Sequence, residues 1–414
     1  MASSPYDGSI RLSTRAPDEG LGAATVAETL TVDAGTPRQP WWGTGAALTD
    51  ASVAELDGHP DRIARLFAPH AADGARLSWL RLPLTATDLS SSWWGWRGRG
   101  DAVHPTGPGR RALAVLRTQI LPVAPHLRIV ATPWTAPPAW KSPATWEGGR
   151  LRDDAVPRYA RLLLDQARWL RRHGVPLRAM TLANEPGFAG DYPSMVVGDA
   201  AMARLRALVE PGLHRLGVRL WGLDHNWSDA DRVAAIGGER LDAVAFHCYE
   251  GEPADAAGMG IPWLVSECTG TTDAAVPTLD FDARVLVRDA IAAGSRGLFF
   301  WNLALPPGAR GAGGGCTTCR GLLTVSGGDA LPEPEFYVLA HLARAAPPGA
   351  RVVAVSGPGD VPAAAFVDDG RLGVIALNDT DRTRWLRFTV TGGATSAVYR
   401  IGPRELLTFS GPLR

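Results

Sequence analysis

The sequence lacks a surplus of either charge, since 42 lysine and arginine residues balance 42 aspartate and glutamate residues among 414. A neutral chain has no strong attraction for nucleic acid or an anionic membrane, so neither is expected as a partner. No apolar run is long enough to span a bilayer, and residues 1–30 show no signal-peptide pattern. We expect a soluble protein, either cytoplasmic or secreted with its leader removed.

Cysteine is scarce, with Cys248, Cys268, Cys316 and Cys319 only, so the chain is not a disulfide-dense scaffold. Cys316 and Cys319 would need two more ligands to bind zinc, and none lies nearby in sequence. A loop disulfide is therefore favoured over a metal site, and no metal or cofactor is predicted. A glycine-rich phosphate loop opening a helix is also absent, which weakens an open nucleotide-binding sheet as the fold.

Tryptophan, in contrast, is abundant, with 15 residues against 6 tyrosines and 10 phenylalanines. Its ring stacks on the apolar face of a sugar, and its N–H can bond a hydroxyl. Any single tryptophan could equally fill the core. The pair Trp41-Trp42 and the cluster at 93–96 lie in loop-like sequence, which favours a binding role for them. The second cluster suggests an aromatic wall beside a confined sugar pocket.

Short apolar runs alternate with amphipathic segments through the middle of the chain. Eight runs are predicted as strands: 43–47, 77–83, 128–133, 179–183, 219–223, 243–247, 263–266 and 297–301. Helices are predicted between them, most clearly at 153–172, 199–216 and 282–293, and weakly at 229–236 and 253–259. This alternation predicts a (β/α)8 TIM barrel over residues 41–347.

The pattern changes after about residue 350. Short strands joined by turns are predicted at 351–356, 363–367, 372–378, 385–391, 396–401 and 406–410, with two more at 10–16 and 28–33. We therefore predict a β-sandwich built from residues 1–40 and 348–414, attached to the barrel.

Polar and aromatic residues follow the predicted barrel strands, where active sites of TIM barrels lie. Glu185 ends the fourth strand and Glu267 the seventh, across the barrel mouth from each other. Two carboxyl groups about 5–5.5 Å apart suit a retaining glycosidase. Their repulsion should keep the acid protonated. The alternative is a structural ion pair with a nearby arginine such as Arg81.

The motifs at the strand ends, taken in order, resemble those of glycoside hydrolase family 30 of clan A. They cover nearly the whole chain, and comprise Gly-Thr-Gly-Ala-Ala-Leu-Thr-Asp from residue 43, Arg-Leu-Pro-Leu from 81, Thr-Pro-Trp-Thr-Ala-Pro-Pro-Ala-Trp-Lys from 132, Asn-Glu-Pro from 184, Phe-His-Cys-Tyr from 246, Ser-Glu-Cys from 266 and Trp-Asn-Leu-Ala-Leu from 301. The resemblance implies a barrel with a side β-sandwich and hydrolysis with retention of configuration.

The resemblance also implies roles for individual residues. Glu185 corresponds to the acid/base and Glu267 to the nucleophile. Substrate-binding roles are implied for Asn184 at the 2-hydroxyl, Asp88 and Trp134 at the outer hydroxyls, Trp301 as a wall, Tyr249 beside the nucleophile, His247 as a supporting donor and Asn226 as a polar contact. Cys268 is expected in the barrel wall, and Arg310 and Arg320 on the solvated surface, with recognition of an acidic substituent as the alternative.

The predicted function is retaining hydrolysis of a β-linked glucoside in a carbohydrate or glycoconjugate, of the glucosylceramide or β-1,6-glucan type. Alternatives are a β-xylosidase, β-fucosidase or β-galactanase of the same family, or a carbohydrate-binding protein without catalysis. Both Glu185 and Glu267 are present, although binding alone would need neither, which argues against the last alternative. Transglycosylation by the same site is a further possibility.

Overall fold

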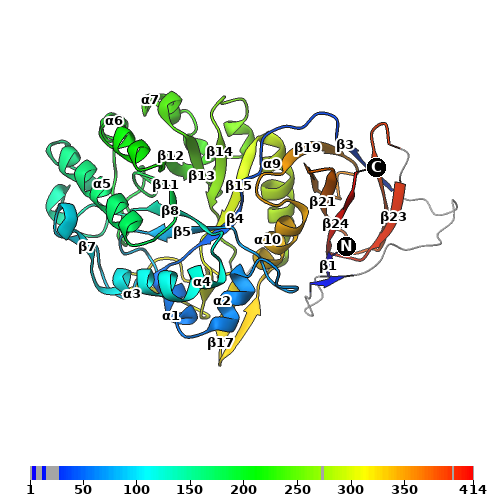
Figure 1. Ribbon diagram of the computed structural model, residues 1–414, viewed down its shortest axis with the longest axis horizontal. Coiled ribbons are helices and arrows are strands. Elements are labelled where there is room, and N and C mark those ends of the chain that lie inside the picture. The colour runs from blue at the N-terminus through cyan, green and yellow to red at the C-terminus, as the bar shows by residue number, and fades with distance from the viewer. Residues whose placement is uncertain (1, 6–11, 15–27, 272–274, 394–395, 414) are drawn as a thin grey trace.

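The computed structural model describes residues 2–5, 12–14, 28–271, 275–393 and 396–413. Eight parallel strands close into a barrel, and a nine-stranded sheet forms a second module at one side (Figure 1). Around the ring the barrel strands are β4 (Gly43–Ala47), β5 (Trp79–Pro83), β8 (Arg128–Thr132), β11 (Leu177–Met180), β12 (Arg219–Asn226), β13 (Ala243–His247), β14 (Trp263–Glu267) and β15 (Ser295–Phe300). The predicted barrel is confirmed, because each of the eight runs overlaps one of these strands, although for 179–183 and β11 the overlap is two residues.

Helices cover the outside of the barrel. They are α1 (Asp50–Leu56), α2 (Pro60–Phe67), α3 (Gly107–Val115), α4 (Leu121–Val123), α5 (Val156–Arg172), α6 (Asp199–Arg215), α7 (Arg232–Ala235), α8 (Ala275–Phe281), α9 (Ala290–Ala293) and α10 (Pro334–Ala345), with π-helical segments at Leu116–Ile120 and Asp282–Asp289. In α5 the residues Val156, Tyr159, Leu163, Ala167 and Leu170 form one buried stripe, and each fully buried leucine such as Leu163 contributes about 1.5–3 kcal/mol. As expected, the helices after β12 and β13 are short: α7 and a 3₁₀ turn at Pro253–Ala256.

Large rings fill the barrel near the beginnings of its strands. The ring centroids of Trp79 and Trp221 lie 5.2 Å apart, and Trp42 stacks on Trp221 at 5.8 Å. Trp41 is fully buried and packs against Phe366 of the second module. The prediction of a binding role for Trp41-Trp42 is therefore wrong, because Trp41 fills core volume at the junction of the two modules and the partly buried Trp42 packs on the rings at the barrel floor.

Both ends of the chain contribute to the second module. Its strand order is β2 (Ser13–Thr14), β1 (Ala2–Pro5), β24 (Glu405–Pro412), β21 (Arg371–Leu377), β20 (Ala363–Asp368), β19 (Arg351–Ser356), β3 (Glu28–Asp33), β22 (Arg384–Val390) and β23 (Ser396–Ile401). The first half of β19 pairs with β20 and the second half with β3, so the chain passes from one layer to the other. The predicted β-sandwich of both termini is confirmed. Of the predicted strand at 10–16, residues 10, 11, 15 and 16 lie outside the described residues.

The helix α10 lies between the barrel and the sandwich (Figure 1) and contacts β4, β21 and β24. His341 of this helix is fully buried and its Nδ1 lies 2.7 Å from the Thr408 hydroxyl. We propose that the divisions near residues 40 and 347 separate the two domains. In the part of the chain that the structure describes, no helix combines the length and apolarity needed to cross a bilayer.

Short strands complete the loops. They are β6 (Trp96–Arg97), β7 (His104–Pro105), β9 (Lys141–Ser142), β10 (Arg150–Leu151), β16 (Ala304–Leu305), β17 (Leu323–Ser326) and β18 (Asp329–Pro332).

Candidate active site

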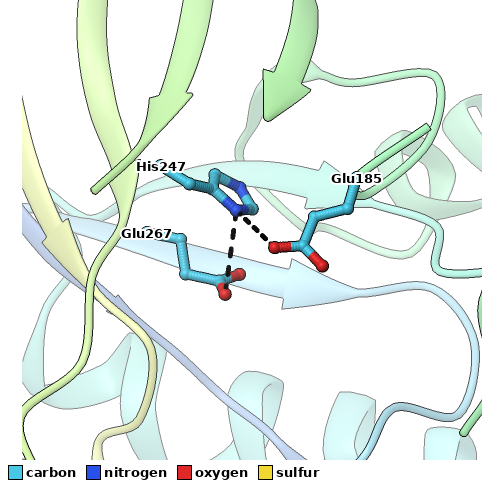
Figure 2. Close-up of side chains that lie close together, drawn as sticks. All are labelled: Glu185, His247 and Glu267. Carbon is cyan, nitrogen blue, oxygen red and sulfur yellow. Dashed lines mark hydrogen bonds and ion pairs between the residues drawn. The ribbon is translucent and has the colours of Figure 1, made fainter. Parts of the chain in front are cut away.

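The two predicted carboxylates face each other at the mouth of the barrel (Figure 2). Glu267 is the last residue of β14, and Glu185 lies five residues beyond the end of β11. An oxygen of each, together with a nitrogen of His247, lies within 4.8 Å of the other two atoms. Glu185 has a positive φ of 44°, a conformation that costs free energy in a residue with a side chain and is common at functional sites.

His247, the last residue of β13, lies beneath both carboxylates and is fully buried. Its Nδ1 is 3.0 Å from Glu185 Oε1, and its Nε2 is 3.2 Å from Asp224 Oδ1. Burial opposes the charged imidazole, but Glu267, Asp224 and Glu185 outweigh it and raise the pKa of His247 to about 10. The predicted supporting role fits this position, because His247 bridges acidic groups without lining the cavity.

The protonation of Glu185 differs from the sequence-based expectation. Burial favours its neutral form, but the hydrogen bond from His247 and nearby positive charges outweigh burial and lower the pKa of Glu185. Repulsion from Glu267 therefore does not set the charge of Glu185. Instead, Glu185 and His247 are joined by a hydrogen bond, so the titration of either group depends on the other.

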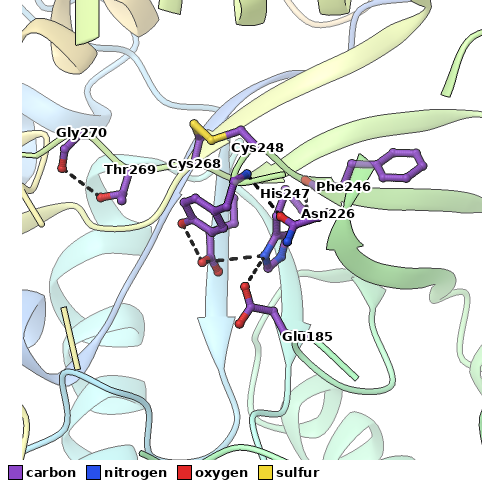
Figure 3. The surroundings of a disulfide bond; sticks show 11 residues. Glu185, Asn226, Phe246, His247, Cys248, Cys268, Thr269 and Gly270 are labelled. Atoms are coloured by element: carbon purple, nitrogen blue, oxygen red, sulfur yellow. Dashed lines mark hydrogen bonds and ion pairs between the residues drawn. A yellow bond between two sulfur atoms is a disulfide. The ribbon is translucent and has the colours of Figure 1, made fainter. Parts of the chain in front are cut away.

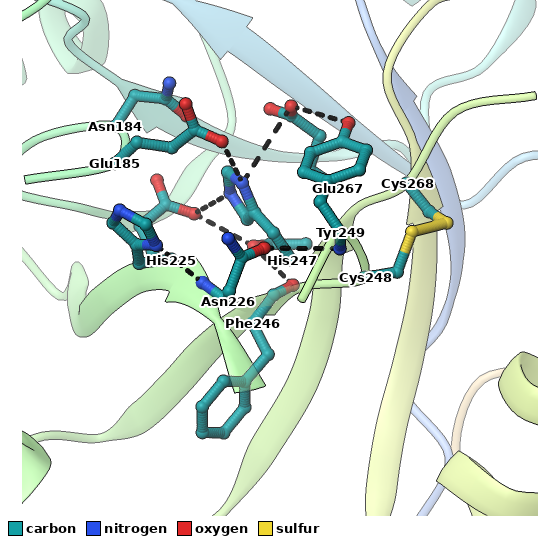
Figure 4. Close-up of polar contacts among 12 residues, drawn as sticks. Asn184, Glu185, His225, Asn226, Phe246, His247, Cys248, Tyr249, Glu267 and Cys268 are labelled. Atoms are coloured by element: carbon teal, nitrogen blue, oxygen red, sulfur yellow. Dashed lines mark hydrogen bonds and ion pairs between the residues drawn. A yellow bond between two sulfur atoms is a disulfide. The ribbon is translucent and has the colours of Figure 1, made fainter. Parts of the chain in front are cut away.

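The buried side chain of Arg81 contacts three polar side chains of the site. Its guanidinium contacts Glu267, donates to Asn184 Oδ1 at 2.7 Å, and donates to Asp224 Oδ2 at 3.0 Å. The ion pair considered as an alternative thus exists. It does not remove Glu267 from the site, since Glu267 also lines the cavity. The Tyr249 hydroxyl donates to Glu267 Oε1 at 2.9 Å, so two donors orient this carboxylate (Figure 4).

A cavity of about 400 Å³ opens above these groups. It is lined by Asp88, Trp134, Asn184, Glu185, Phe188, Tyr192, His225, Asn226, Tyr249, Glu267, Thr269, Trp301, Cys316 and Cys319. Eight of the nine predicted site residues are in this lining, and His247 is the exception. The volume suits a small number of sugar units.

Stacked rings and a carboxyl group form one end of the cavity. Trp134 and Trp301 stack with centroids 4.9 Å apart, and the Arg81 guanidinium lies over Trp134 at 4.8 Å. Asp88 receives hydrogen bonds from the Trp301 side chain and the Cys316 backbone. Burial, with the charge of Glu267 adding to it, raises the pKa of Asp88 to about 7.

The glycine-rich loop at 311–315 packs directly on Asp88. A Cβ at Gly311 would lie 1.8 Å from the Asp88 backbone oxygen, and Gly315 has a φ of +83°. Only glycine fits such an approach and such a backbone. The loop therefore closes the cavity over Asp88.

The aromatic wall predicted from residues 93–96 is wrong. Trp94 donates to Asp50 Oδ2 at 2.7 Å, Trp96 donates to the Leu84 carbonyl at 2.7 Å, and Trp93 donates to Glu147 Oε1 at 2.6 Å. None of these tryptophans lines the cavity. Their N–H groups are used by the protein itself, so they support the loops around the site.

All four cysteines form disulfides, and Figure 3 shows the bond between Cys248 and Cys268. The Cys316–Cys319 loop disulfide is confirmed, and it borders the cavity. Cys268 lies in the barrel wall as expected, but its bond to Cys248 was not predicted. This second bond ties the residue that follows β13 to the residue that follows β14, beside Tyr249 and Glu267. The two cysteines are 20 positions apart in the sequence. They come close only because β13 and β14 are paired neighbours in the barrel, so the sequence alone did not indicate this disulfide.

Arg320 is buried, so both readings of it as a surface or substrate-facing residue are wrong. It donates to Glu335 Oε1 at 2.6 Å and lies 3.8 Å from Glu333. Its backbone N–H bonds Gly270, which holds the loop of Cys316 and Cys319 against the barrel. Arg310 is exposed, as expected.

The sequence reasoning missed several residues near the reacting groups, among them Asp224, Phe188 and Tyr192, and also His225 and Thr269 in the cavity lining. Asp224 is fully buried in β12 and accepts hydrogen bonds from Arg81, Thr181 and Ser266, and one of its oxygens lies 3.2 Å from His247 Nε2. A charged residue inside an apolar run was the available signal. Phe188 and Tyr192 line the cavity beyond Glu185, with ring centroids 6.1 Å apart, and their loop gave no periodic signal.

Glu185, His247 and Glu267 also have the spacing of metal ligands. A cation would have to displace the proton between His247 and Glu185, and it would lie beside the Arg81 guanidinium that contacts Glu267. This donor set fits a proton-sharing pair better than a metal centre.

Asp88 leads to a prediction about pH. Its Oδ1 is buried without a hydrogen-bond partner, and the ionised carboxylate can accept two sugar hydroxyls. Because the pKa of Asp88 is about 7, kcat/KM should fall as pH is lowered through that value. Asp88→Asn should lack this dependence and lose about 10- to 100-fold in kcat/KM, the contribution of a charged hydrogen bond. Initial rates between pH 5 and 9 check this, and a dependence unchanged in Asp88→Asn would contradict it.

Comparison with known proteins supports the class indicated by the site. A scan against protein-family models finds none that matches the chain. The chain is 26% identical to endo-1,6-β-D-glucanase neg1 of Aspergillus fumigatus over an alignment of 442 positions, which covers 93% of this chain and 89% of the relative.

Solved structures share the fold over almost the entire chain. The endo-β1,6-glucanase BT3312 superposes with a TM-score of 0.85 at 20% identity, covering 100% of this chain and 99% of that one. The catalytic domain of GH30 xylanase C from Talaromyces cellulolyticus has a TM-score of 0.73 at 18% identity, covering 92% and 99%. A closed barrel with a side β-sandwich and paired acidic groups in one cavity defines a glycosyl hydrolase. More particularly, the chain is a family 30-like glycosyl hydrolase of clan A.

Proposed function

We propose that this enzyme hydrolyses β-1,6-linked glucan with retention of configuration. The observation that carries the proposal is the pair of facing carboxylates, whose oxygens lie within 4.8 Å across one cavity. That spacing is shorter than the roughly 6.5–9.5 Å between the carboxyl groups of inverting enzymes, and it suits direct attack by one carboxylate. The choice of sugar and linkage rests on the relatives named endo-1,6-β-glucanases.

In the proposed first step, a Glu267 oxygen attacks the anomeric carbon while the bond to the glycosidic oxygen breaks. Glu185 gives a proton to that oxygen. The sugar is then bound covalently to Glu267, and the aglycone leaves as an alcohol. In the second step Glu185 takes a proton from water, whose oxygen attacks the anomeric carbon and releases Glu267.

The proton for the first step comes from the pair that Glu185 forms with His247. With a glycosidic oxygen in place and water displaced, the charged form of Glu185 loses solvation, and transfer of the shared proton from Nδ1 to the carboxylate becomes favourable. His247 is a positioning residue here, because it acts through Glu185. Asp224, on its other side, keeps Nε2 engaged during the transfer.

The remaining residues hold the sugar. We propose that Asn184, fixed by Arg81, bonds the 2-hydroxyl, where the bond strengthens in the transition state. Asp88 and Trp134 hold the outer hydroxyls, and Trp301 forms the wall behind the ring. Asn226 receives the Tyr249 backbone N–H at 3.2 Å, so its free amide group can reach the substrate side.

Oligosaccharides of defined linkage test the proposal. The enzyme is expected to cleave β-1,6-linked glucose oligomers at least about tenfold faster than β-1,3- or β-1,4-linked ones or xylo-oligosaccharides, a preference of about 1.4 kcal/mol in the transition state. Proton NMR of the first product should show the β-anomer. Faster cleavage of xylo-oligosaccharides would overturn the substrate, and an initial α-anomer would overturn the mechanism.

We also propose that the protein works in an oxidising compartment, hence secreted, since both cysteine pairs are bonded. Alkylation of the native, unreduced protein should find no free thiol. Four alkylated cysteines would favour the cytoplasm.

A further inference from the structure

A second cavity, of about 620 Å³, lies on the β-sandwich. It is lined by Glu28, Asp360, Thr380, Asp381, Arg382, Thr383, Arg384 and Trp385. It shares no residue with the catalytic cavity, and no catalytic role in this protein uses it. Its size falls in the range of ordinary ligand sites.

Trp385 is the sole tryptophan of the chain after residue 301. In β22 the neighbouring Leu386 and Phe388 are buried in the sandwich core, so alternation turns Trp385 to the opposite face. Trp385 is half-buried, and among the described residues its ring stacks on no other ring and its N–H meets no acceptor. A broad apolar face and an N–H are thus both available to a ligand.

The charged groups around this ring are held in place. Arg384 forms ion pairs with both Glu28 and Asp360, which come from separate parts of the chain. Asp381 pairs with Arg404 at 3.2 Å, and Arg404 is fixed at 2.7 Å by Asp280 of the barrel. Pre-ordered carboxylates, guanidinium groups and threonine hydroxyls can bond hydroxyl groups without a large ordering cost.

The charge of the lining favours a neutral ligand. Three carboxylates (Glu28, Asp360, Asp381) face two arginines (Arg382, Arg384), which leaves a single excess negative charge. This balance disfavours nucleic acid and other polyanions. An aromatic platform with alternating donors and acceptors matches a polyhydroxylated ring, whose faces are apolar and whose edge carries hydroxyls.

We propose that this cavity is a second glucan-binding site, without catalytic activity, that holds part of the polymer while another part occupies the catalytic cavity. Trp385 is the stacking platform, and Arg384, Asp381 and the threonines bond the hydroxyls. The identity of the glycan as β-1,6-glucan rests on the proposed function, whereas the site itself does not. Two linked contacts on one polymer raise the overall affinity above that of either site.

Affinity electrophoresis in gels containing soluble β-1,6-glucan tests the site. Glu267→Gln serves as the background, so that the polymer is not digested. In it, Trp385→Ala should bind the polymer about tenfold more weakly, the scale of a lost aromatic anchor. Trp385→Phe, which keeps a ring, should bind nearly as well as the background. In the otherwise wild-type enzyme, Trp385→Ala should leave turnover of a small aryl β-glucoside unchanged.

The two proposals fail in different ways. Undiminished polymer binding by Trp385→Ala, in a variant that melts at the parent temperature, would overturn the second site. Parallel gels contain β-1,3-glucan, β-1,4-glucan or xylan. Retardation by one of these alone, lost in Trp385→Ala, would support the site and overturn the β-1,6 assignment.

Adding Asp88→Ala weakens binding of the polymer in the catalytic cavity, so the remaining retardation should then depend almost wholly on Trp385.

Discussion

Glu267→Ala is expected to reduce turnover of every β-glucoside by about 10⁴-fold or more, as loss of a nucleophile does in other enzymes. The carboxylate is held by Arg81 and Tyr249 against the cavity, and no other carboxylate occupies the same place in the described lining. Azide can enter the space left by the side chain and attack the anomeric carbon directly. The product should be a glycosyl azide of inverted, α configuration, identified by NMR.

Glu239→Ala provides the matched control, because Glu239 is exposed in the short 3₁₀ helix Gly238–Arg240 and does not line the cavity. It should retain full activity and give no azide product. A Glu267→Ala enzyme with more than a small fraction of wild-type turnover would exclude Glu267 as the nucleophile. So would an azide product of retained configuration.

Glu185→Ala is expected to slow turnover by about 10²- to 10⁴-fold with poor leaving groups, the usual contribution of a general acid. An aryl glucoside with a very acidic phenol needs no proton, so formation of the covalent intermediate should be almost unaffected. Water then attacks without a base, and a burst of phenol should precede slow turnover. A plot of rate against leaving-group pKa, steep for the variant and shallow for the wild type, checks this.

Glu185→Ala should also respond to azide, which replaces water and needs no base. Here the product is expected to keep the β configuration, opposite to that from Glu267→Ala. Equal losses for all leaving groups would contradict the acid role. His247→Gln provides a further comparison. It removes the titratable partner of Glu185, so the dependence of kcat/KM on pH should shift, while both carboxylates stay in place.

The sequence alone determined the architecture and the two central residues. Apolar runs such as 43–47 and 243–247 match β4 and β13 to the residue, because strands buried on both faces need continuous apolar side chains. Glu185 and Glu267 were predictable because parallel strands end at one rim, where a polar residue after an apolar run must lie.

The contacts between side chains of different barrel strands were decided only by the tertiary structure. Asp224, Arg81 and His247 come from three different strands. The hydrogen bond from His247 and the charge of Arg81 lower the pKa of Glu185 against the effect of burial, whereas the sequence suggested that repulsion would raise it. Likewise, tryptophans look alike in sequence whether they fill core, as Trp41 and Trp94 do, or line the cavity, as Trp134 does. Local patterns specify which residues are buried or at a strand end, whereas pKa values, disulfide partners and cavity walls depend on neighbours distant in sequence.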